Sequence, residues 1–217
     1  MKKGEKKKRE KALRRRTARK QAHRQSSLAT VSRAELHHIH QARSYPIEGC
    51  WTQPDWKEHG LAVVVIARRQ PNGNLVFGMY LVDYYCLGVK NAEAHAEVPP
   101  GEFLNDYLPR LFRPDPPVDI SPALAHEIVY GSVEFAARYG FHPHADFRLA
   151  QYVLDPPDVH RRSGAVTFGR GGKPMYISGP HDNVDAILLQ LERTAGEGNY
   201  DYLVQLVGTA PVRKGSG

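Results

Sequence analysis

Two histidines and an aspartate lie close together in the segment GFHPHADF, residues 140–147. His142, His144 and Asp146 occupy every second position, so in an extended chain their side chains project to the same side. Imidazole and carboxylate groups are ligands for Zn²⁺. A zinc site would need further ligands from elsewhere, and the candidates are Cys50, Cys86 and the histidines of HHIH, His37, His38 and His40.

The same segment also contains the residues that end a helix. Gly140 stands one position past the last expected helical residue, where a left-handed conformation costs glycine little. Phe141 is placed to fold back onto the last turn, and Pro143 prevents the helix from resuming. We favour the helix stop over the zinc site, because it explains the spacing without a metal and no recognised zinc spacing is present.

Acidic residues suggest a second chemistry. Asp83 continues an apolar stripe in a strand that we expect to be buried, where an unpaired carboxylate is costly. It either caps the following turn, CLGVKN, or pairs with Lys90 or an arginine. Alternatively, it joins the helix residues Glu127 and Glu134 to hold Mg²⁺ for phosphodiester cleavage. A solvated helix face with an ion pair from Glu134 to Arg138 explains the two glutamates equally well, so we favour the structural interpretation.

The strongest charge signal lies at the N-terminus. Residues 1–24, the basic N-terminal segment, hold 13 Lys or Arg against two acidic residues, a net charge of +11. The remaining residues carry 17 basic and 21 acidic side chains, a net charge of −4. A dense cationic segment attracts phosphate backbones without reading their sequence. We therefore expect RNA or DNA binding through nine tail cations, although a merely solubilising segment is the alternative: Lys6, Lys7, Lys8, Arg9, Arg14, Arg15, Arg16, Arg19 and Lys20.

Length and composition limit the remaining possibilities. The 217 residues are 41% hydrophobic and 24% charged, which is typical of a single globular domain. We expect no membrane partner, because the sequence has neither a long apolar run nor the apolar region of a secretory signal. Two cysteines outside any CxxC pair favour a reducing compartment, and we expect the cytoplasm. No nucleotide-binding or hydrolase signature is present, so we expect no cofactor beyond the Mg²⁺ or Zn²⁺ of the two alternatives.

The pattern of apolar and turn-forming residues predicts the strands and helices that position these side chains. Residues 61–68 and 75–86 are β-rich and flank QPNGN, which predicts a hairpin with a buried second strand. Ser121 and Pro122 begin the clearest helix, which runs to residue 139. Residues 146–154 are predicted to form a strand, and 165–179 a hairpin that turns at Gly171 and Gly172.

Shorter helices complete the expected fold. The capping pair Ser32 and Glu35 predicts a helix over residues 33–42, the segment 99–112 contains a short amphipathic helix, and Gly196 ends a helix over 182–195. We expect an α+β fold in which a largely antiparallel sheet packs with two or three helices. The basic tail, disordered or helical, and a short linker helix occupy residues 1–42, and a single domain that could also bind a protein partner occupies 43–212.

Overall fold

The computed structural model describes residues 32–204 and 212–214. By compactness the chain divides into two units, residues 1–37 and 38–217. In the first unit, the described part is the start of helix α2 (Arg33–His40). Its N-terminus is closed by the predicted capping pair: Glu35 N donates to Ser32 Oγ at 3.1 Å, and Ser32 N donates to Glu35 Oε2 at 2.7 Å.

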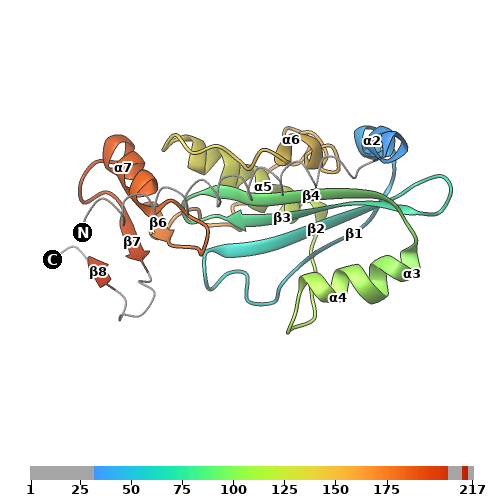
Figure 1. The fold of residues 1–217 in the computed structure, drawn as a ribbon, viewed down its shortest axis with the longest axis horizontal. Helices are drawn as coiled ribbons and strands as arrows, with labels where there is room; N and C mark the ends of the chain where they lie inside the picture. The colour runs from blue at the N-terminus through green and yellow to red at the C-terminus, as the bar shows by residue number, and fades with distance from the viewer. Residues whose placement is uncertain (1–31, 205–211, 215–217) are drawn as a thin grey trace, which may run out of the picture. The chain divides into compact units, whose positions relative to one another are not determined.

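The second unit is built on a five-stranded antiparallel sheet with the strand order β4-β3-β2-β1-β5 (Figure 1). After the short 3₁₀ helix η1 (Ala42–Ser44), four strands form a meander in which each strand pairs with the next, and β5 then returns beside β1. The strands are β1 (Ile47–Thr52), β2 (Leu61–Arg69), β3 (Leu75–Asp83), β4 (Gly88–Val98) and β5 (Val118–Asp119). The α+β prediction is confirmed.

The hairpin between β2 and β3 is predicted correctly. Gly73 N donates to Gln70 O at 2.9 Å, and Gln70 N donates to Asn74 O at 2.8 Å. Gly73 has a φ of +87°, which L side chains rarely adopt. As predicted, β3 lies inside the sheet and is buried on both faces, although it ends at Asp83 and not at residue 86.

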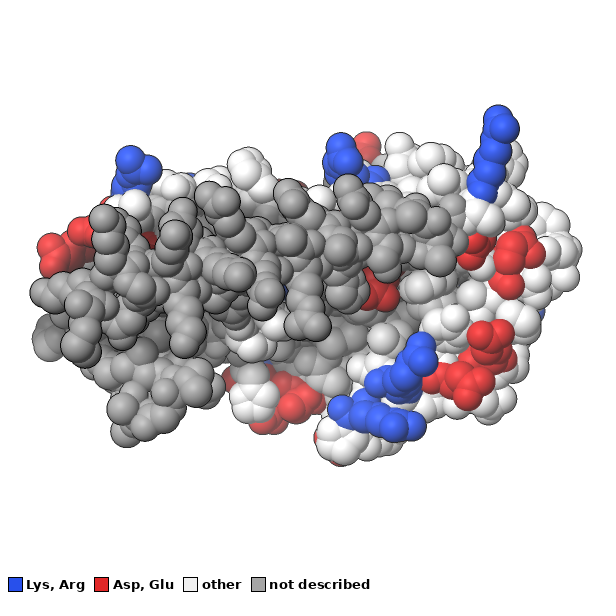
Figure 2. Space-filling view, viewed as in Figure 1, with Lys and Arg blue, Asp and Glu red and all other residues white. Residues whose placement is uncertain are grey.

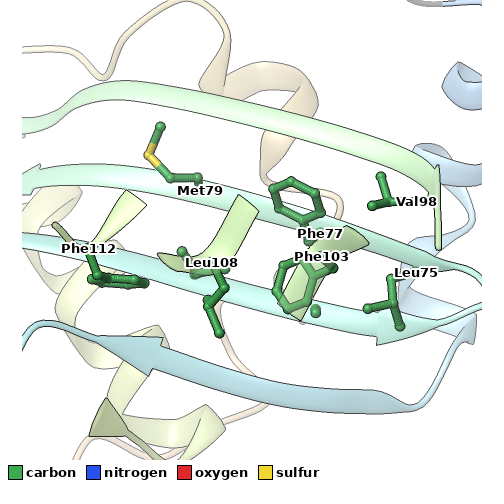
Figure 3. Close-up of a cluster of buried hydrophobic side chains, with 9 residues drawn as sticks. Leu75, Phe77, Met79, Val98, Phe103, Leu108 and Phe112 are labelled. Atoms are coloured by element: carbon green, nitrogen blue, oxygen red, sulfur yellow. The ribbon is translucent and has the colours of Figure 1, made fainter. Parts of the chain in front are cut away.

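One face of the sheet is covered by a continuous helical segment that follows β4. It consists of α3 (Pro100–Glu102), the π-helical turn η2 (Phe103–Tyr107) and α4 (Leu108–Leu111). Phe103, Leu108 and Phe112 pack on Phe77 and Met79 of β3 (Figure 3). This apolar contact fixes the segment on the sheet, because apolar surface removed from water stabilises the fold by about 25 cal/mol per Å².

Helices α5 (Pro122–Ala137) and α6 (Phe147–Ala150) lie against the opposite face. Ser121 Oγ caps α5 by accepting from Leu124 N at 3.1 Å, as predicted. At the other end, Gly140 has a φ of +75° and Phe141 N donates to Ala136 O at 3.1 Å. The helix stop at Gly140 and Phe141 is therefore confirmed.

A second, three-stranded sheet follows, formed by β6 (Met175–Ile177), β7 (Asp201–Val204) and β8 (Val212–Lys214). The predicted helix that ends before Gly196 is α7 (Val184–Thr194), and its Leu191 packs with Tyr176 and Cys86. Met175 N donates to Tyr85 O at 3.1 Å, which joins the start of β6 to the turn after β3.

Two predicted elements are wrong. Residues 146–154 form α6 and a following turn instead of a strand, because their buried side chains recur at helical spacing: Phe147, Ala150, Val153 and Leu154. In the segment 165–179, the chain turns at Gly171 and Gly172 as predicted. The turn is flanked by one isolated antiparallel β-bridge, between Arg170 and Lys173. The expected hairpin is absent, since β6 pairs in parallel with β7.

Candidate functional site

Asp83 caps the turn that follows β3. Its Oδ1 accepts from Tyr85 N at 3.0 Å and from Cys86 N at 2.9 Å, and the residue is only 5% exposed. Burial raises the pKa of Asp83 to about 6, although Lys90 and the backbone N–H groups of residues 85–87 act in the opposite direction. Asp83 thus has the structural partners that one interpretation of the sequence predicted.

The two helix glutamates have different environments. Glu127 is buried, and its Oε2 accepts from Ser163 N at 2.8 Å and Ser163 Oγ at 2.7 Å, while Oε1 accepts from Val166 N at 3.3 Å. These hydrogen bonds lower the pKa of Glu127 in spite of its burial. Glu134 is exposed and pairs with Arg162, not with Arg138 as expected. Each of the three predicted acids therefore has its own set of partners.

The predicted histidine site contains a pair. His144 Nδ1 lies 3.5 Å from Asp146 Oδ2, and His144 N donates to Val89 O at 2.9 Å. Among the described residues, His142 does not join them in a group of three ligands. Of the suggested extra ligands, both cysteines are buried, and His38 contacts Glu97 and Tyr45.

The nine tail cations lie outside the described residues, so the predicted nucleic-acid contacts have no structural description. On the face in Figure 2, acidic and basic side chains of the described residues are interspersed. No helix within residues 32–204 and 212–214 combines the length and apolar character that crossing a bilayer requires.

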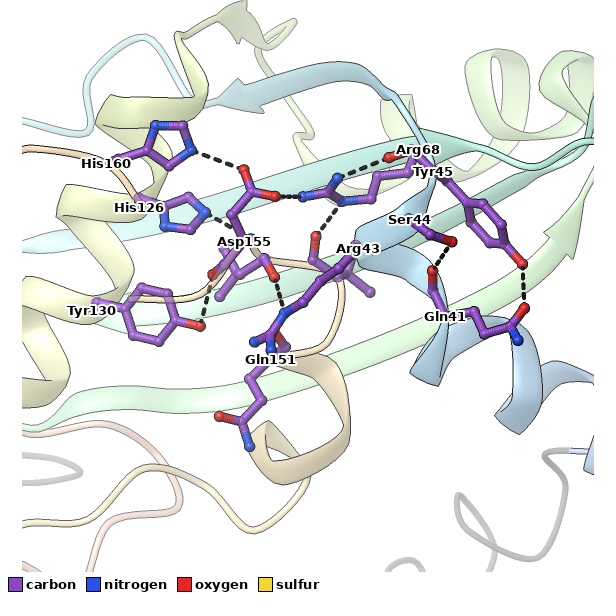
Figure 4. Close-up of polar contacts among 12 residues, drawn as sticks. Gln41, Arg43, Ser44, Tyr45, Arg68, His126, Tyr130, Gln151, Asp155 and His160 are labelled. Carbon is purple, nitrogen blue, oxygen red and sulfur yellow. Dashed lines mark hydrogen bonds and ion pairs between the residues drawn. The ribbon is translucent and has the colours of Figure 1, made fainter. Parts of the chain in front are cut away.

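Sequence reasoning missed a cluster formed by His126, Asp155 and His160. One ligand atom from each residue lies within 4.8 Å of the other two, and no other such group of three occurs in the described part of the chain. His126 comes from α5, whereas Asp155 and His160 begin and end the segment DPPDVH (Figure 4). One signal in the sequence could have identified part of it: Asp155 and His160 are five residues apart, and the two prolines between them restrict the backbone of the loop.

Asp155 is the centre of this cluster. His160 Nε2 lies 2.8 Å from Asp155 Oδ2, and Arg68 forms an ion pair with Oδ1. The Asp155 backbone contributes as well: its N–H donates to His126 Nε2 at 3.0 Å, and its carbonyl accepts from Tyr130 at 3.3 Å. The hydrogen bonds from His160 and Arg68 overcome the effect of burial and lower the pKa of Asp155, which is ionised at neutral pH.

Arg68 holds the carboxylate in place. Its side chain is 3% exposed, and it donates from Nε to Val153 O at 2.7 Å and from Nη1 to Tyr45 O at 2.9 Å. The guanidinium therefore joins β2, the chain before β1 and the segment after α6. A buried charge that is fully paired in this way fixes Asp155 Oδ1 and leaves Oδ2 facing His160 (Figure 4).

His126 is the most buried member, with 4% of its surface exposed. Burial, with a further contribution from the neighbouring His160, lowers the pKa of His126 to about 4, so the ring is neutral at pH 7. Because Nε2 accepts from the Asp155 N–H, the neutral ring carries its proton on Nδ1. Nδ1 is buried and has no hydrogen-bond partner among the described residues.

The nearby thiol does not add a nucleophile. Cys50 is a free, buried cysteine, and burial raises its pKa to about 12, against the opposing effect of Arg68. It is protonated at neutral pH, whereas nucleophilic cysteines need a thiolate. The chemically available groups of the cluster are therefore two imidazoles and one oriented carboxylate.

Comparison of the chain with protein-family models, with curated proteins and with solved structures finds no match.

Proposed function

We propose that this protein binds RNA or DNA through its basic N-terminal segment. The observation that carries the proposal is the separation of charge along the chain: +11 in residues 1–24 against −4 in the rest. Opposite charges on a terminal segment and on the rest of the chain are typical of an interaction arm. Each cation that neutralises a phosphate releases condensed counterions, which favours binding.

The contacts are with the phosphate backbone and carry no sequence readout. The segment contains no Phe, Tyr or Trp that could stack on a base, and lysine and arginine recognise phosphates in any sequence. The folded unit, whose exposed charges are mixed in sign, would then serve as a platform for a protein partner. We place this activity in the cytoplasm, since two free buried thiols suit a reducing compartment.

The alternative, a metal-dependent nuclease with Mg²⁺ at Asp83 and Glu127, stays a prediction. It has no supporting contact, because Asp83 caps one turn and Glu127 holds the loop at Ser163. Magnesium sites use carboxylates whose oxygens are free to coordinate. The binding proposal is the better supported of the two, because the charge separation is extreme and needs no rearrangement of the fold.

Two full-length variants with equal charge changes test the proposal. In the first, four cations of the segment are replaced by glutamine; in the second, four exposed arginines of the folded unit are replaced: Arg14, Arg15, Arg16 and Arg19 against Arg110, Arg148, Arg161 and Arg193. Fluorescence anisotropy with labelled single-stranded RNA, single-stranded DNA and duplex DNA measures the affinity of each protein.

We expect the first variant to bind at least about tenfold more weakly at low salt and the second to remain close to wild type. Equal losses in the two variants would mean that net charge alone governs binding. No detectable binding by the wild type to any of the three probes would refute the proposal.

A further inference from the structure

We propose that His126, Asp155 and His160 form a binding site for a divalent transition-metal ion, with Zn²⁺ the best match. The three ligand atoms already lie within 4.8 Å of one another, and they come from a helix and from both ends of one loop. The site is distinct from the basic N-terminal segment and does not depend on the proposed function.

The donor set determines which metals fit. Two imidazole nitrogens and one carboxylate oxygen suit Zn²⁺ and its transition-metal neighbours. Mg²⁺ and Ca²⁺ prefer oxygen ligands, of which this cluster offers one side chain. We therefore expect selectivity for zinc over magnesium, which also separates this site from the magnesium site considered at Asp83.

The spacing of His160 and Asp155 is close to that of two ligands on one ion. Nε2 of His160 and Oδ2 of Asp155 are 2.8 Å apart, with a proton between them in the metal-free protein. Bond lengths of about 2.0 Å in a tetrahedral zinc site place neighbouring ligand atoms roughly 3.3 Å apart. A metal can therefore replace the proton after the two side chains separate by about 0.5 Å.

His126 supplies the third ligand through Nε2, the ring nitrogen that carries the lone pair. The residue is only 4% exposed, so helix α5 and its surroundings hold the ring in place beside Asp155. Coordination takes the lone pair that now accepts from the Asp155 N–H, so a metal ion replaces this hydrogen bond.

The surroundings of Asp155 match those of a metal-binding carboxylate. Arg68 holds Oδ1 and leaves Oδ2 available, and Tyr130 holds the backbone carbonyl. Hydrogen bonds of this kind orient ligands in metal sites. The guanidinium charge also repels a cation, so we expect weaker binding than in four-ligand structural sites.

Three protein ligands leave one coordination position open. The side chains of His160 and Asp155 are 24% and 19% exposed, so water can reach the cluster from their side. Zinc sites with three protein ligands and one open position are typical of catalytic centres.

The test uses the full chain, freed of metal with a chelator and titrated with ZnCl₂ by isothermal calorimetry. The key variant is His160→Ala, whose side chain is partly exposed, and a second variant is His126→Gln, whose amide can still accept from the Asp155 N–H. The matched control is His144→Ala, because His144 forms a similar pair with Asp146 but has no third ligand among residues 32–204.

We expect one equivalent of Zn²⁺ in the wild type and in His144→Ala, and at least about tenfold weaker binding in both cluster variants. The Co²⁺-loaded wild type should show a tetrahedral visible spectrum that His160→Ala abolishes, and this readout decides the matter if His126→Gln does not fold. Absence of zinc binding, unchanged binding in folded His160→Ala, or loss in His144→Ala would overturn the proposal.

Discussion

Nε2 of His160 lies 2.8 Å from Oδ2 of Asp155, five residues earlier in the chain, while Oδ1 of the same carboxylate is paired with Arg68 on strand β2. The Asp155 carboxylate therefore joins the two ends of the loop 155–160 and also connects this loop to the five-stranded sheet. We expect the stability of this region to depend on the ion pair of the buried Arg68, and the neighbouring Arg69 provides a more exposed pair for comparison.

Arg68→Ala should destabilise the folded unit by about 3–5 kcal/mol, because it removes the buried guanidinium from Asp155, whose side chain is only 19% exposed, and from two backbone carbonyls. Arg69→Ala removes an ion pair with Glu48, and both of those side chains are largely accessible to water: 41% and 35% exposed. Exposed pairs contribute little, so that variant should unfold close to wild type. Urea denaturation of both variants measures the difference, and similar losses would contradict the assigned role of Arg68.

Asp83→Asn should cost more stability at pH 4 than at pH 7. The buried carboxyl has a pKa of about 6, above its ordinary value of 3.8, so the folded state binds its proton more tightly than the unfolded state. Its stabilising effect is complete below pH 3.8 and is lost as the pH rises through 6, whereas asparagine does not titrate. Chemical denaturation of both proteins at several pH values tests the sign, and a cost that grows with pH would show that Asp83 is stabilised as a carboxylate.

Substitution of the two predicted catalytic glutamates should have different effects on the free energy of unfolding. Glu127→Ala leaves the Ser163 hydroxyl and two backbone N–H groups without their acceptor, so we expect a loss of about 1–3 kcal/mol. Glu134→Ala removes a surface contact with Arg162 and should unfold like wild type. A nuclease with both acids in its site would instead lose metal-dependent cleavage in both variants while each stays folded.

Gly140→Ala should destabilise the fold by about 1 kcal/mol, because residue 140 is held at a φ of +75° after α5. A valine there should cost more, since a β-branched residue is less tolerant of this region. The control is Gly101→Ala at the start of the helical segment after β4, where the nearest atom to an added Cβ lies 4.0 Å away. Thermal unfolding compares them, and equal midpoints would remove the case for a left-handed helix stop.

The sequence predicts the elements whose signals are local. The QPNGN turn, the Ser121 cap and the Gly140 stop each depend on a few neighbouring residues, and the structure confirms them. Strand β4 was not predicted, because its sequence GVKNAEAHAEV is rich in residues of low strand propensity and pairs only with β3 within the five-stranded sheet. Its position is set by tertiary pairing, which no local pattern encodes.

The His126 cluster could not be derived for a related reason. Asp155 and His160 are five residues apart, but their meeting with His126 and Arg68 depends on how α5 and the loop after α6 lie on the sheet. His142 and His144 suggest a metal site in the sequence because only Pro143 separates them. Ligand sets assembled from distant segments leave only weak signals in a single sequence.

The most direct test of nucleic-acid binding is the salt dependence of affinity in the full-length protein. The slope of log Kobs against log salt concentration should be steeply negative for the wild type, by about 0.7 to 0.9 per phosphate contacted. Replacing all nine tail cations by glutamine should flatten the slope and lower the affinity at low salt. A slope that is the same in wild type and variant, or affinity that does not change with salt, would contradict backbone binding through residues 1–24.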